Sequence, residues 1–495
     1  MDAAAAAAAS SSLSSMALPS LKPHNPISKL SIFQRSTIPT TLIPSWASLV
    51  SSNPALSPKF QSFLRCSTKP DTSANSEIHS EQNDEPSSVS NSQNQKASEP
   101  GEASVVFSSS SPVDSSSYAC SRGLVFDLGP SNSWDGAEIG SPVVKRFLSD
   151  EEERWYMWYH GRSEGDSCSG LIGLAISSNG VHWERGGGPS RSSSDVGSVM
   201  NCGKDWWVFD THGVRPSETV IMSSSRVRAP PGVYWLYYTG YSSETAEVTD
   251  HSMEFCLENP DRCLINDGVN QGECGKWNVL KSLPGLAISQ DGRHWARIEG
   301  EHHSGALIDV GSEKDWDSLF ISSPHVVYHE NGDLRMYYHS FDLEKGHFAV
   351  GIARSRDGVR WVKLGKVIGG GKTGSFDEFG AMNPCVMRNR IDGNYMMAYE
   401  GVAADGRRSI GMAISPNGLK EWVRLQDEAI LEPSDRGCWD DKDVGSPCLV
   451  QMDKEENELR LYYRGVGNEG RVGIGMAVSE GKDVRSFRRW TGFHL

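Results

Sequence analysis

The chain contains no apolar run long enough to cross a bilayer, so the sequence predicts no integral membrane segment. Cysteine is also scarce, since ten residues in a chain of 495 do not make a disulfide scaffold. Cys256, Cys263 and Cys274 share one segment but lack the short paired spacing of a zinc site. We expect no metal and no cofactor, with a metal or a regulatory disulfide in that segment as the minor alternative. Cys385 and Cys448 each follow a proline in an apolar run, where a small buried hydrophobe is expected.

A basic stripe is missing as well. The formal net charge is −15, and residues 1–70 contribute +5 through six basic residues and one acid, so the remainder carries −20. Beyond short pairs such as Arg407-Arg408 and Arg488-Arg489, no basic cluster offsets this charge. An acidic surface repels phosphate backbones, and nucleic-acid binding is therefore not expected.

Acids are almost absent from residues 1–70, where Asp2 stands alone among many Ser, Thr, Ala and Pro. This composition is typical of an organelle transit peptide, and we expect import into the chloroplast stroma. A secretory signal is the rival interpretation, but Ala3 to Ala9 followed by serines is a poor apolar core. Residues 71–117 are rich in Ser, Asn, Gln, Glu and Pro and predict a disordered linker.

Residues 118–495 are built from a repeated unit. Its first mark is an aromatic strand ending near a tyrosine, present in five copies: residues 155–159, 234–238, 334–338, 395–399 and 459–463. A Gly-x-Ala-x-Ser element follows each copy and leads to Trp183, Trp295, Trp361, Trp422 or Trp490. In four copies an Asn-Gly or Asp-Gly pair separates the two, which favours a tight hairpin because glycine accepts positive φ.

A third strand precedes each aromatic strand and begins at a proline: Pro142, Pro216, Pro324, Pro384 and Pro447. Four antiparallel strands per unit, repeated five times, predict an all-β fold, a five-bladed β-propeller behind a disordered N-terminal extension. The second blade carries an insertion at residues 241–284, and such loops usually shape a site.

These motifs resemble those of the five-bladed superfamily that holds arabinanases, levansucrases and invertases (glycoside hydrolase families 43, 68 and 32) and the family 130 mannoside phosphorylases. The matching features are the tyrosine strand, the Gly-x-Ala-x-Ser hairpin with its tryptophan, and the aromatic-Asp pair before each first strand. The chain lacks the Asn-Asp-Pro-Asn and Arg-Asp-Pro signatures, so sucrose cleavage is not expected. The resemblance implies catalytic carboxylates from different blades at the narrow axial end, about 5 Å apart for retention and farther apart for inversion.

Repeat positions whose residue changes from blade to blade are the candidate site positions, because a residue that recurs at one position in every blade is needed for the structure of the blade itself. Near the start of the proline strands the variable slots hold Glu138, His212, Arg215 and Asp443. The slot after the repeated tyrosine holds His160, Thr239, His339, Glu400 and Arg464. We expect Glu138, Asp443 and Glu400 to be catalytic, with Glu400 favoured as the proton donor if it faces the axis. We expect His160, His212, Arg215, His339 and Arg464 to bind substrate.

A structural alternative stands beside each of these roles. The acids are also consistent with solvated turns, Arg215 with an ion pair between blades, and the residues after the tyrosine with polar pairs across adjacent blades. One slot does recur: Asp135, Asp317, Asp377 and Asp440 each stand seven residues before the proline. We interpret these four as caps of a turn or of the start of a strand.

The first functional hypothesis is a glycoside hydrolase acting on a furanosidic or related oligosaccharide. The alternatives are a non-catalytic propeller in the plastid that binds sugar or protein, and a family 130-like phosphorylase with a phosphate site of Arg and His. The expected partner is a carbohydrate, and the sequence identifies no protein partner.

Overall fold

The computed structural model describes residues 121–148, 153–164, 170–186, 196–222, 232–248, 277–329, 332–452, 458–481 and 483–492. They form five antiparallel sheets and contain no helix in these ranges. Residues 1–70 and 71–117 and the three cysteines of the insertion lie outside the described residues. The prediction of an all-β five-bladed propeller is confirmed. Within these ranges no helix is long and apolar enough to span a membrane.

Each blade runs from an inner strand at the axis to an outer edge. Blade 1 contains β2 (Glu138–Leu148), β3 (Glu153–Arg162), β4 (Leu171–Ser177) and β5 (Glu184–Arg185), with β6 (Ser198–Met200) also pairing with β4. Blade 2 contains β7 (Gly213–Met222), β8 (Val233–Val248), β9 (Trp277–Ser289) and β10 (Ala296–Ile298). Blade 3 contains β11 (Ser322–His329), β12 (Asp333–Asp342), β13 (His347–Ser355) and β14 (Val362–Ile368).

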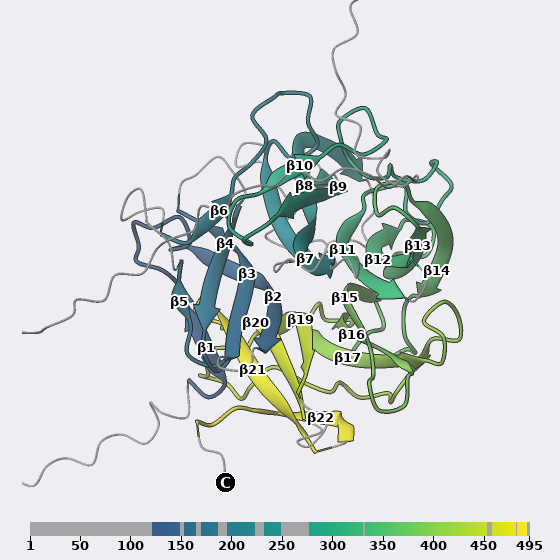
Figure 1. The fold of residues 1–495 in the computed structure, drawn as a ribbon. Helices are drawn as coiled ribbons and strands as arrows, with labels where there is room; N and C mark the ends of the chain where they lie inside the picture. Colours follow the sequence, from purple (N-terminus) through teal and green to yellow (C-terminus); the bar gives the residue numbers. More distant parts are fainter. Residues whose placement is uncertain are drawn as a thin grey trace, which may run out of the picture. The chain divides into compact units, whose positions relative to one another are not determined.

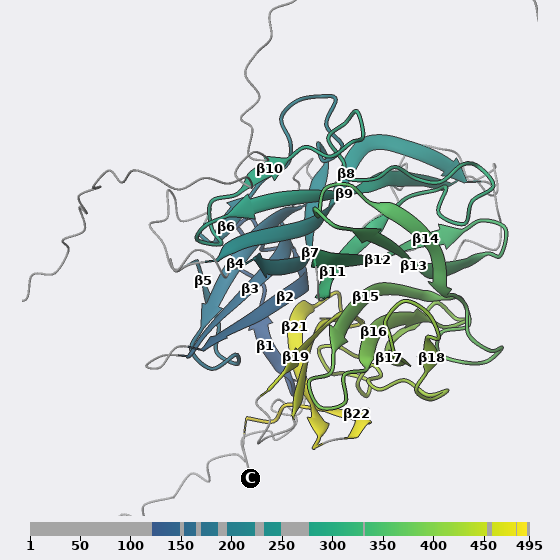
Figure 2. The ribbon, with the colours of Figure 1, turned by 45° about the vertical axis from the view of Figure 1, so that its right-hand side comes forward.

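Blade 4 contains β15 (Ala381–Arg388), β16 (Tyr395–Val402), β17 (Arg408–Ser415) and β18 (Val423–Arg424), and blade 5 contains β19 (Asp443–Gln451), β20 (Leu459–Val466), β21 (Val472–Glu480) and β22 (Asp483–Arg489). In Figure 1 the inner strands β2, β7, β11, β15 and β19 gather around the centre of the ring. Figure 2 shows β14 and β18 on the outer side of their sheets, away from β11 and β15.

Besides β6, one further described strand lies outside the four-strand repeat. β1 (Leu124–Asp127) pairs antiparallel with β21, so a segment that precedes blade 1 completes blade 5. Phe126 is buried in this closure, and Trp490 accepts a backbone hydrogen bond from Gly123. The repeat pattern did not predict β1 because this strand belongs to no copy of the unit.

The insertion in blade 2 begins and ends as a sheet. β8 and β9 extend beyond the repeat and remain paired from Thr245–Leu280 to Val248–Trp277. Residues 249–276, the middle of the predicted insertion, lie outside the described residues.

Two neighbouring positions on each middle strand contribute to the packing of the blades, and both are aromatic except in blade 4, where the first is Ala398. In the other four blades the first aromatic hydroxyl or indole N–H donates to a turn glycine carbonyl of an adjacent blade: Trp158 to Gly292 (2.8 Å), Tyr237 to Gly358 (3.3 Å), Tyr337 to Gly418 (2.5 Å) and Tyr462 to Gly180 (2.7 Å). Those glycines have φ between 71° and 76°, as the sequence predicted. The predicted hairpin forms, but its loop is longer than a tight turn: in blade 3 the loop lies between Ser355 and Val362, and Asp357 Oδ1 accepts from the backbone N–H groups of Val359 and Arg360.

The second tyrosine belongs to a module found in all five blades. Its hydroxyl donates to a buried aspartate at 2.8–3.0 Å, and its ring packs on the aromatic residue before that aspartate. An arginine or lysine from the outer strand pairs with the same carboxylate. The five modules are Asp135–Tyr159–Arg185, Asp210–Tyr238–Arg297, Asp317–Tyr338–Lys363, Asp377–Tyr399–Arg424 and Asp440–Tyr463–Arg489. These aspartates therefore serve the blades, and Asp210 is a fifth member that the spacing rule missed.

Candidate functional site

The inner strands are all kinked where they reach the axis. In four blades the residue before the proline has a left-handed backbone: φ is 46° at Ser141, 52° at Ser323, 48° at Asn383 and 47° at Ser446. The ladder register shifts at each of these points, so each strand carries a bulge. Such backbone costs energy for residues other than glycine and recurs at functional sites. In blade 2 the register shifts between Pro216 and Glu218, and Pro216 occupies the position that Ser141 has in blade 1, so this proline stands one residue closer to its aspartate, Asp210.

A ring of polar side chains joins each blade to the next at this level. The acceptor is the side chain after the repeated tyrosine, and the donor is the kinked backbone of the next inner strand. Thr239 Oγ1 accepts from the Ser323 N–H (2.8 Å), His339 Nδ1 from the Asn383 N–H (3.2 Å) and Glu400 Oε2 from the Ser446 N–H (2.8 Å). His160 Nδ1 lies 3.4 Å from the Val214 carbonyl. These residues therefore pair across adjacent blades, the structural alternative that the sequence left open.

Two predicted acids meet at one arginine. Glu400, which is buried, also accepts from Asn383 Nδ2 (2.8 Å), and its Oε1 lies 3.6 Å from the Arg408 guanidinium. Asp443 Oδ1 accepts from the Arg408 backbone N–H at 3.0 Å, and Asp443 is only half-buried. The chain approaches Glu400 closely at Gly445, where an added Cβ would lie 2.1 Å from Oε2. Blades 4 and 5 thus bring both carboxylates to Arg408, the first residue of β17.

The third predicted acid, Glu138, lies in the neighbouring part of the ring of polar side chains. Glu138 is buried and pairs with Arg464 (3.0 Å) and Arg162 (3.2 Å). Arg464 stands directly opposite Gly445 in the ladder, and Gly445 contacts Glu400. Three carboxylates from blades 1, 4 and 5 therefore gather at one end of the axis with the guanidinium groups of Arg408, Arg464 and Arg162.

The remaining predicted residues lie toward blades 2 and 3. Arg215 is buried, with its guanidinium 5.9 Å from the centre of the Tyr241 ring. His212 is half-buried just before β7, and burial lowers its pKa. His339 is buried between the rings of Phe320 and Phe348. The structure thus brings Arg464 together with the acids and links His339 to Glu400 through Asn383, whereas His212 and Arg215 lie in blade 2.

Arg408 was missed by the sequence analysis although a signal existed. It stands three residues before the glycine of the Gly-x-Ala element. The corresponding residues in the five blades are Gly170, Ser282, Phe348, Arg408 and Val472. This slot varies as strongly as those that were chosen, so the same comparison of repeats would have identified Arg408.

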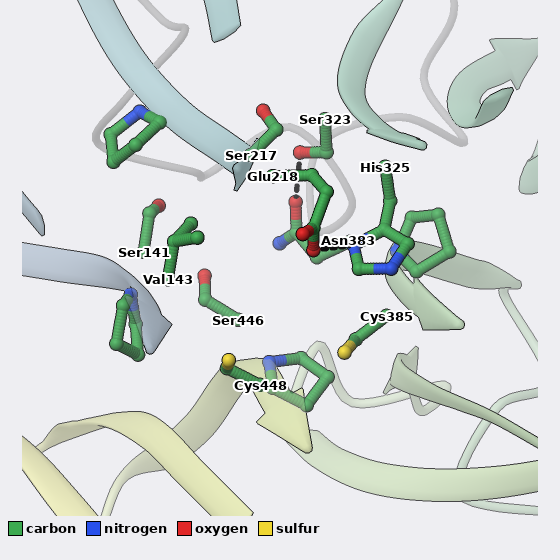
Figure 3. A pocket seen from close by; sticks show the side chains of 14 residues that line it. Ser141, Val143, Ser217, Glu218, Ser323, His325, Asn383, Cys385, Ser446 and Cys448 are labelled. Carbon is green, nitrogen blue, oxygen red and sulfur yellow. Dashed lines mark hydrogen bonds and ion pairs between the residues drawn. The ribbon is translucent and has the colours of Figure 1, made fainter. Parts of the chain in front are cut away.

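A small pocket of about 30 Å³ opens on the axis beside the bulges. All five inner strands contribute to it, and Figure 3 shows Ser141, Ser323, Asn383 and Ser446 around it together with Glu218 and two cysteines. The Ser323 hydroxyl donates to Asn383 Oδ1 at 2.6 Å. The lining therefore offers hydroxyls and one amide, groups that hydrogen bond to the hydroxyls of a sugar.

No cation site is formed by the acids, histidines and cysteines of the described ranges, which contain no group of three or more arranged to hold a metal ion.

Comparisons with known proteins give likeness in structure only. No protein-family model matches the chain, and no curated protein does. A structure of a thermostable family-43 glycoside hydrolase is 16% identical with a TM-score of 0.43, covering 69% of this chain and 91% of that one. A family 130 glycoside hydrolase structure is also 16% identical, with a TM-score of 0.43, over 69% and 85%.

A third similar structure is an N-acetylgalactosamine deacetylase from F. plautii in complex with a blood group B trisaccharide. It is 13% identical with a TM-score of 0.49, covering 76% of this chain and 99% of that one. Structural neighbours of the chain thus include glycoside hydrolases of the family 43 and family 130 types. At these identities the comparison transfers no activity and no residue role.

Proposed function

We propose that this protein is a glycoside hydrolase that acts on a furanosidic or related oligosaccharide at the axial end of the propeller. The observation that carries the proposal is the meeting of Glu400 and Asp443, from different blades, at Arg408, with Glu138 in the adjoining ion pair. Glycosidic cleavage by this route needs one carboxyl group that exchanges a proton and one that stays ionised beside the positive charge of the transition state.

The contacts divide these roles. Glu400 accepts two N–H hydrogen bonds and faces a guanidinium, an environment that stabilises a carboxylate. In the proposal Glu400 is therefore the ionised group and not the proton donor that the sequence favoured. Asp443 is more exposed and its side chain has one backbone donor, so it exchanges the proton with the leaving group or water. Glu138 positions Arg464.

A second candidate is a propeller that binds the sugar without cleaving it. It is favoured by the ion pairs themselves, because Glu138 and Glu400 both face arginines and neither carboxylate is left to act as an acid. Phosphorolysis ranks below both candidates. Arg464, one of the four residues proposed for phosphate, is already bound to Glu138, and Arg215 lies against Tyr241.

Turnover by the full chain on a panel of oligosaccharides, with and without phosphate, tests the proposal. Asp443→Asn and Glu400→Gln are each expected to lower kcat by about 10²–10⁴-fold, the usual contribution of a positioned acid–base group. The matched controls are Asp427→Asn and Glu301→Gln, whose side chains are 61% and 64% exposed and pair only at the surface. Both controls are expected to retain full activity.

The outcomes separate the candidates. Loss of turnover in both axial variants, with a normal far-ultraviolet spectrum and intact sugar binding, supports hydrolysis. Calorimetric binding of a sugar that the wild-type chain never cleaves supports the binding propeller. A strict requirement for phosphate selects the phosphorylase.

The chloroplast location remains a proposal that rests on the composition of residues 1–70. A fluorescent protein fused behind residues 1–70 is expected to enter plastids, and secretion of the fusion would select the rival signal.

A further inference from the structure

The pocket on the axis contains a second set of reactive side chains, which the proposed hydrolase does not use. They occupy one equivalent position of the five inner strands, just beyond the bulge. In order of the blades they are Val143, Glu218, His325, Cys385 and Cys448. All five line the pocket, and Figure 3 shows them around it. Because Val143 fills the same position in blade 1, packing alone does not require a reactive group there.

The two cysteines lie on the inner strands of adjacent blades and line the same pocket. Both are free thiols and both are buried. Cys448 Sγ accepts a hydrogen bond from the Val144 N–H, and Cys385 Sγ accepts one from the Leu449 N–H, both at 3.3 Å. The Cys385 sulfur is therefore held against the backbone of β19, one residue from Cys448. The interaction of the two thiols raises the pKa of Cys385 and lowers that of Cys448.

A cation lies near this pair. Lys145 forms an ion pair with Glu218, and Glu218 Oε2 lies 3.2 Å from His325 Nδ1. Burial alone would lower the pKa of Lys145, but the Glu218 carboxylate raises it, so the ammonium persists. Burial lowers the pKa of His325, which leaves its imidazole neutral near pH 7. Lys145 helps to lower the pKa of Cys448, whereas burial and Glu218 oppose that shift.

We propose that Cys448 is a peroxide-reactive thiol and that Cys385 resolves its oxidised form into a disulfide between blades 4 and 5. The Cys448 thiol first loses its proton to solvent, and the thiolate attacks one oxygen of a small hydroperoxide. The S–O bond forms, the O–O bond breaks, and the leaving hydroxide takes a proton from water. Cys385 then attacks the sulfenic sulfur: the S–S bond forms, the S–O bond breaks, and water leaves with the thiol proton. Two thiols and one hydrogen peroxide thus give one disulfide and two waters.

The surroundings select the class of oxidant. Cys385 is 4% exposed and Cys448 is 7% exposed, and the prolines of the inner strands line the same pocket. A hydroperoxide of two or three heavy atoms fits beside the sulfurs, whereas a tripeptide disulfide such as glutathione disulfide cannot bring its S–S bond to them. The site is therefore specific for small hydroperoxides.

The test is peptide mapping of the full chain by mass spectrometry under non-reducing conditions, after treatment with hydrogen peroxide or with glutathione disulfide. Peroxide is expected to link the peptides of Cys385 and Cys448 with the loss of two hydrogens, and glutathione disulfide is not. Cys385→Ser is expected to leave a sulfenic acid at Cys448 that dimedone labels, and Cys448→Ser to leave Cys385 unlabelled. Cys438→Ser, which removes a half-buried free thiol outside the pocket, is the matched control and is expected to react like the wild type.

The charge environment gives an independent readout. Thiolate fraction changes about tenfold per pKa unit. Lys145 lowers the pKa of Cys448 more than Glu218 raises it, so the double variant Lys145→Met with Glu218→Gln is expected to slow labelling of Cys448 at pH 7, by less than about tenfold. Removing both charges together avoids an unpaired buried ion, and raising the pH is expected to restore the rate. Tyr462 and His325 are the other titratable groups near Cys448. Burial raises the pKa of Tyr462 and lowers the pKa of His325, so both side chains are neutral at pH 7. Peroxide that oxidises Cys438 while Cys385 and Cys448 stay reduced would overturn the proposal, as would equal linkage by glutathione disulfide.

Discussion

The module of aspartate, tyrosine and arginine makes a sharp prediction at Asp377. Its carboxylate accepts from the Tyr399 hydroxyl (2.9 Å), from Arg424 Nε (2.6 Å) and from the Ser375 hydroxyl (2.8 Å). Asp377→Ala removes the carboxylate that accepts all three hydrogen bonds and leaves the Arg424 guanidinium half-buried without its counter-ion. Breaking a buried pair by removing one partner costs about 3–5 kcal/mol, because the remaining charge is left uncompensated.

Thermal unfolding followed by circular dichroism measures this cost. A domain somewhat larger than 250 residues loses about 2 °C in Tm per kcal/mol, so Asp377→Ala is expected to lower Tm by roughly 6–10 °C. Tyr399→Phe removes one hydrogen bond to a charged group and is expected to cost about 1.5–3 kcal/mol. The double variant should then cost less than the sum of the two single changes, since both remove the same hydrogen bond.

The matched control is Asp427→Ala. Asp427 also pairs with a cation, Lys372, but its side chain is 61% exposed. Surface pairs contribute about 0–1 kcal/mol, so this variant is expected to melt within about 2 °C of the wild type. If Asp377→Ala melts with the control, the reasoning that these aspartates hold the blades together is refuted.

Three further predictions follow from other parts of the ring. Burial raises the pKa of eight core tyrosines. Their contribution to the free energy of unfolding is therefore fully present below the pKa of tyrosine in the unfolded chain, about 10, and is lost as the pH rises above it. The loss is up to about 1.4 kcal/mol per pH unit for each tyrosine. Tyrosinate absorbance should therefore rise together with unfolding, and a gradual rise in folded protein would contradict this. Gly445→Ala drives a Cβ toward Glu400 and should lower Tm and activity, whereas Ser446→Gly relieves a left-handed φ and should melt at or above the wild type. Phe126→Ala should cost about 3–5 kcal/mol in urea unfolding through loss of buried contacts in the closing strand, and a change below about 1 kcal/mol would argue against that closure.

The repeat made most of the blade architecture predictable. The prolines and tyrosines of the five copies mark the inner and middle strands, because each blade must bury the same two faces against its neighbours. The repeat did not predict β1, because its partner, β21, lies about 350 residues away in the sequence and no local pattern indicates that pairing. The spacing rule missed Asp210 because the proline of blade 2 stands one residue earlier relative to the bulge than the prolines of the other blades.

The candidate site was harder to predict for a physical reason. A variable slot shows that a residue does not serve the repeat, but it does not show what that residue touches. Glu400 and Arg464 were chosen as candidate site residues, and their contacts to Ser446 and Glu138, which cross from one blade to the next, could not be read from the repeat. Lys145, Glu218 and His325 were not chosen, because their interaction depends on three strands meeting at the axis.

The pairing of β1 with β21 also governs when the molecule is complete. A ribosome releases residues 124–127 long before residues 472–480, so the nascent chain carries four finished blades and an unpaired first strand. That strand presents open backbone donors and acceptors until the last hairpin emerges. A circular permutant that joins the two ends behind β22 and opens the chain between blades 2 and 3 would make β22 and β1 continuous. Such a chain should reach its native state faster, because the pairing of β1 with β21 would become local, and the closure that remains, between blades 2 and 3, joins two sheets that are each complete.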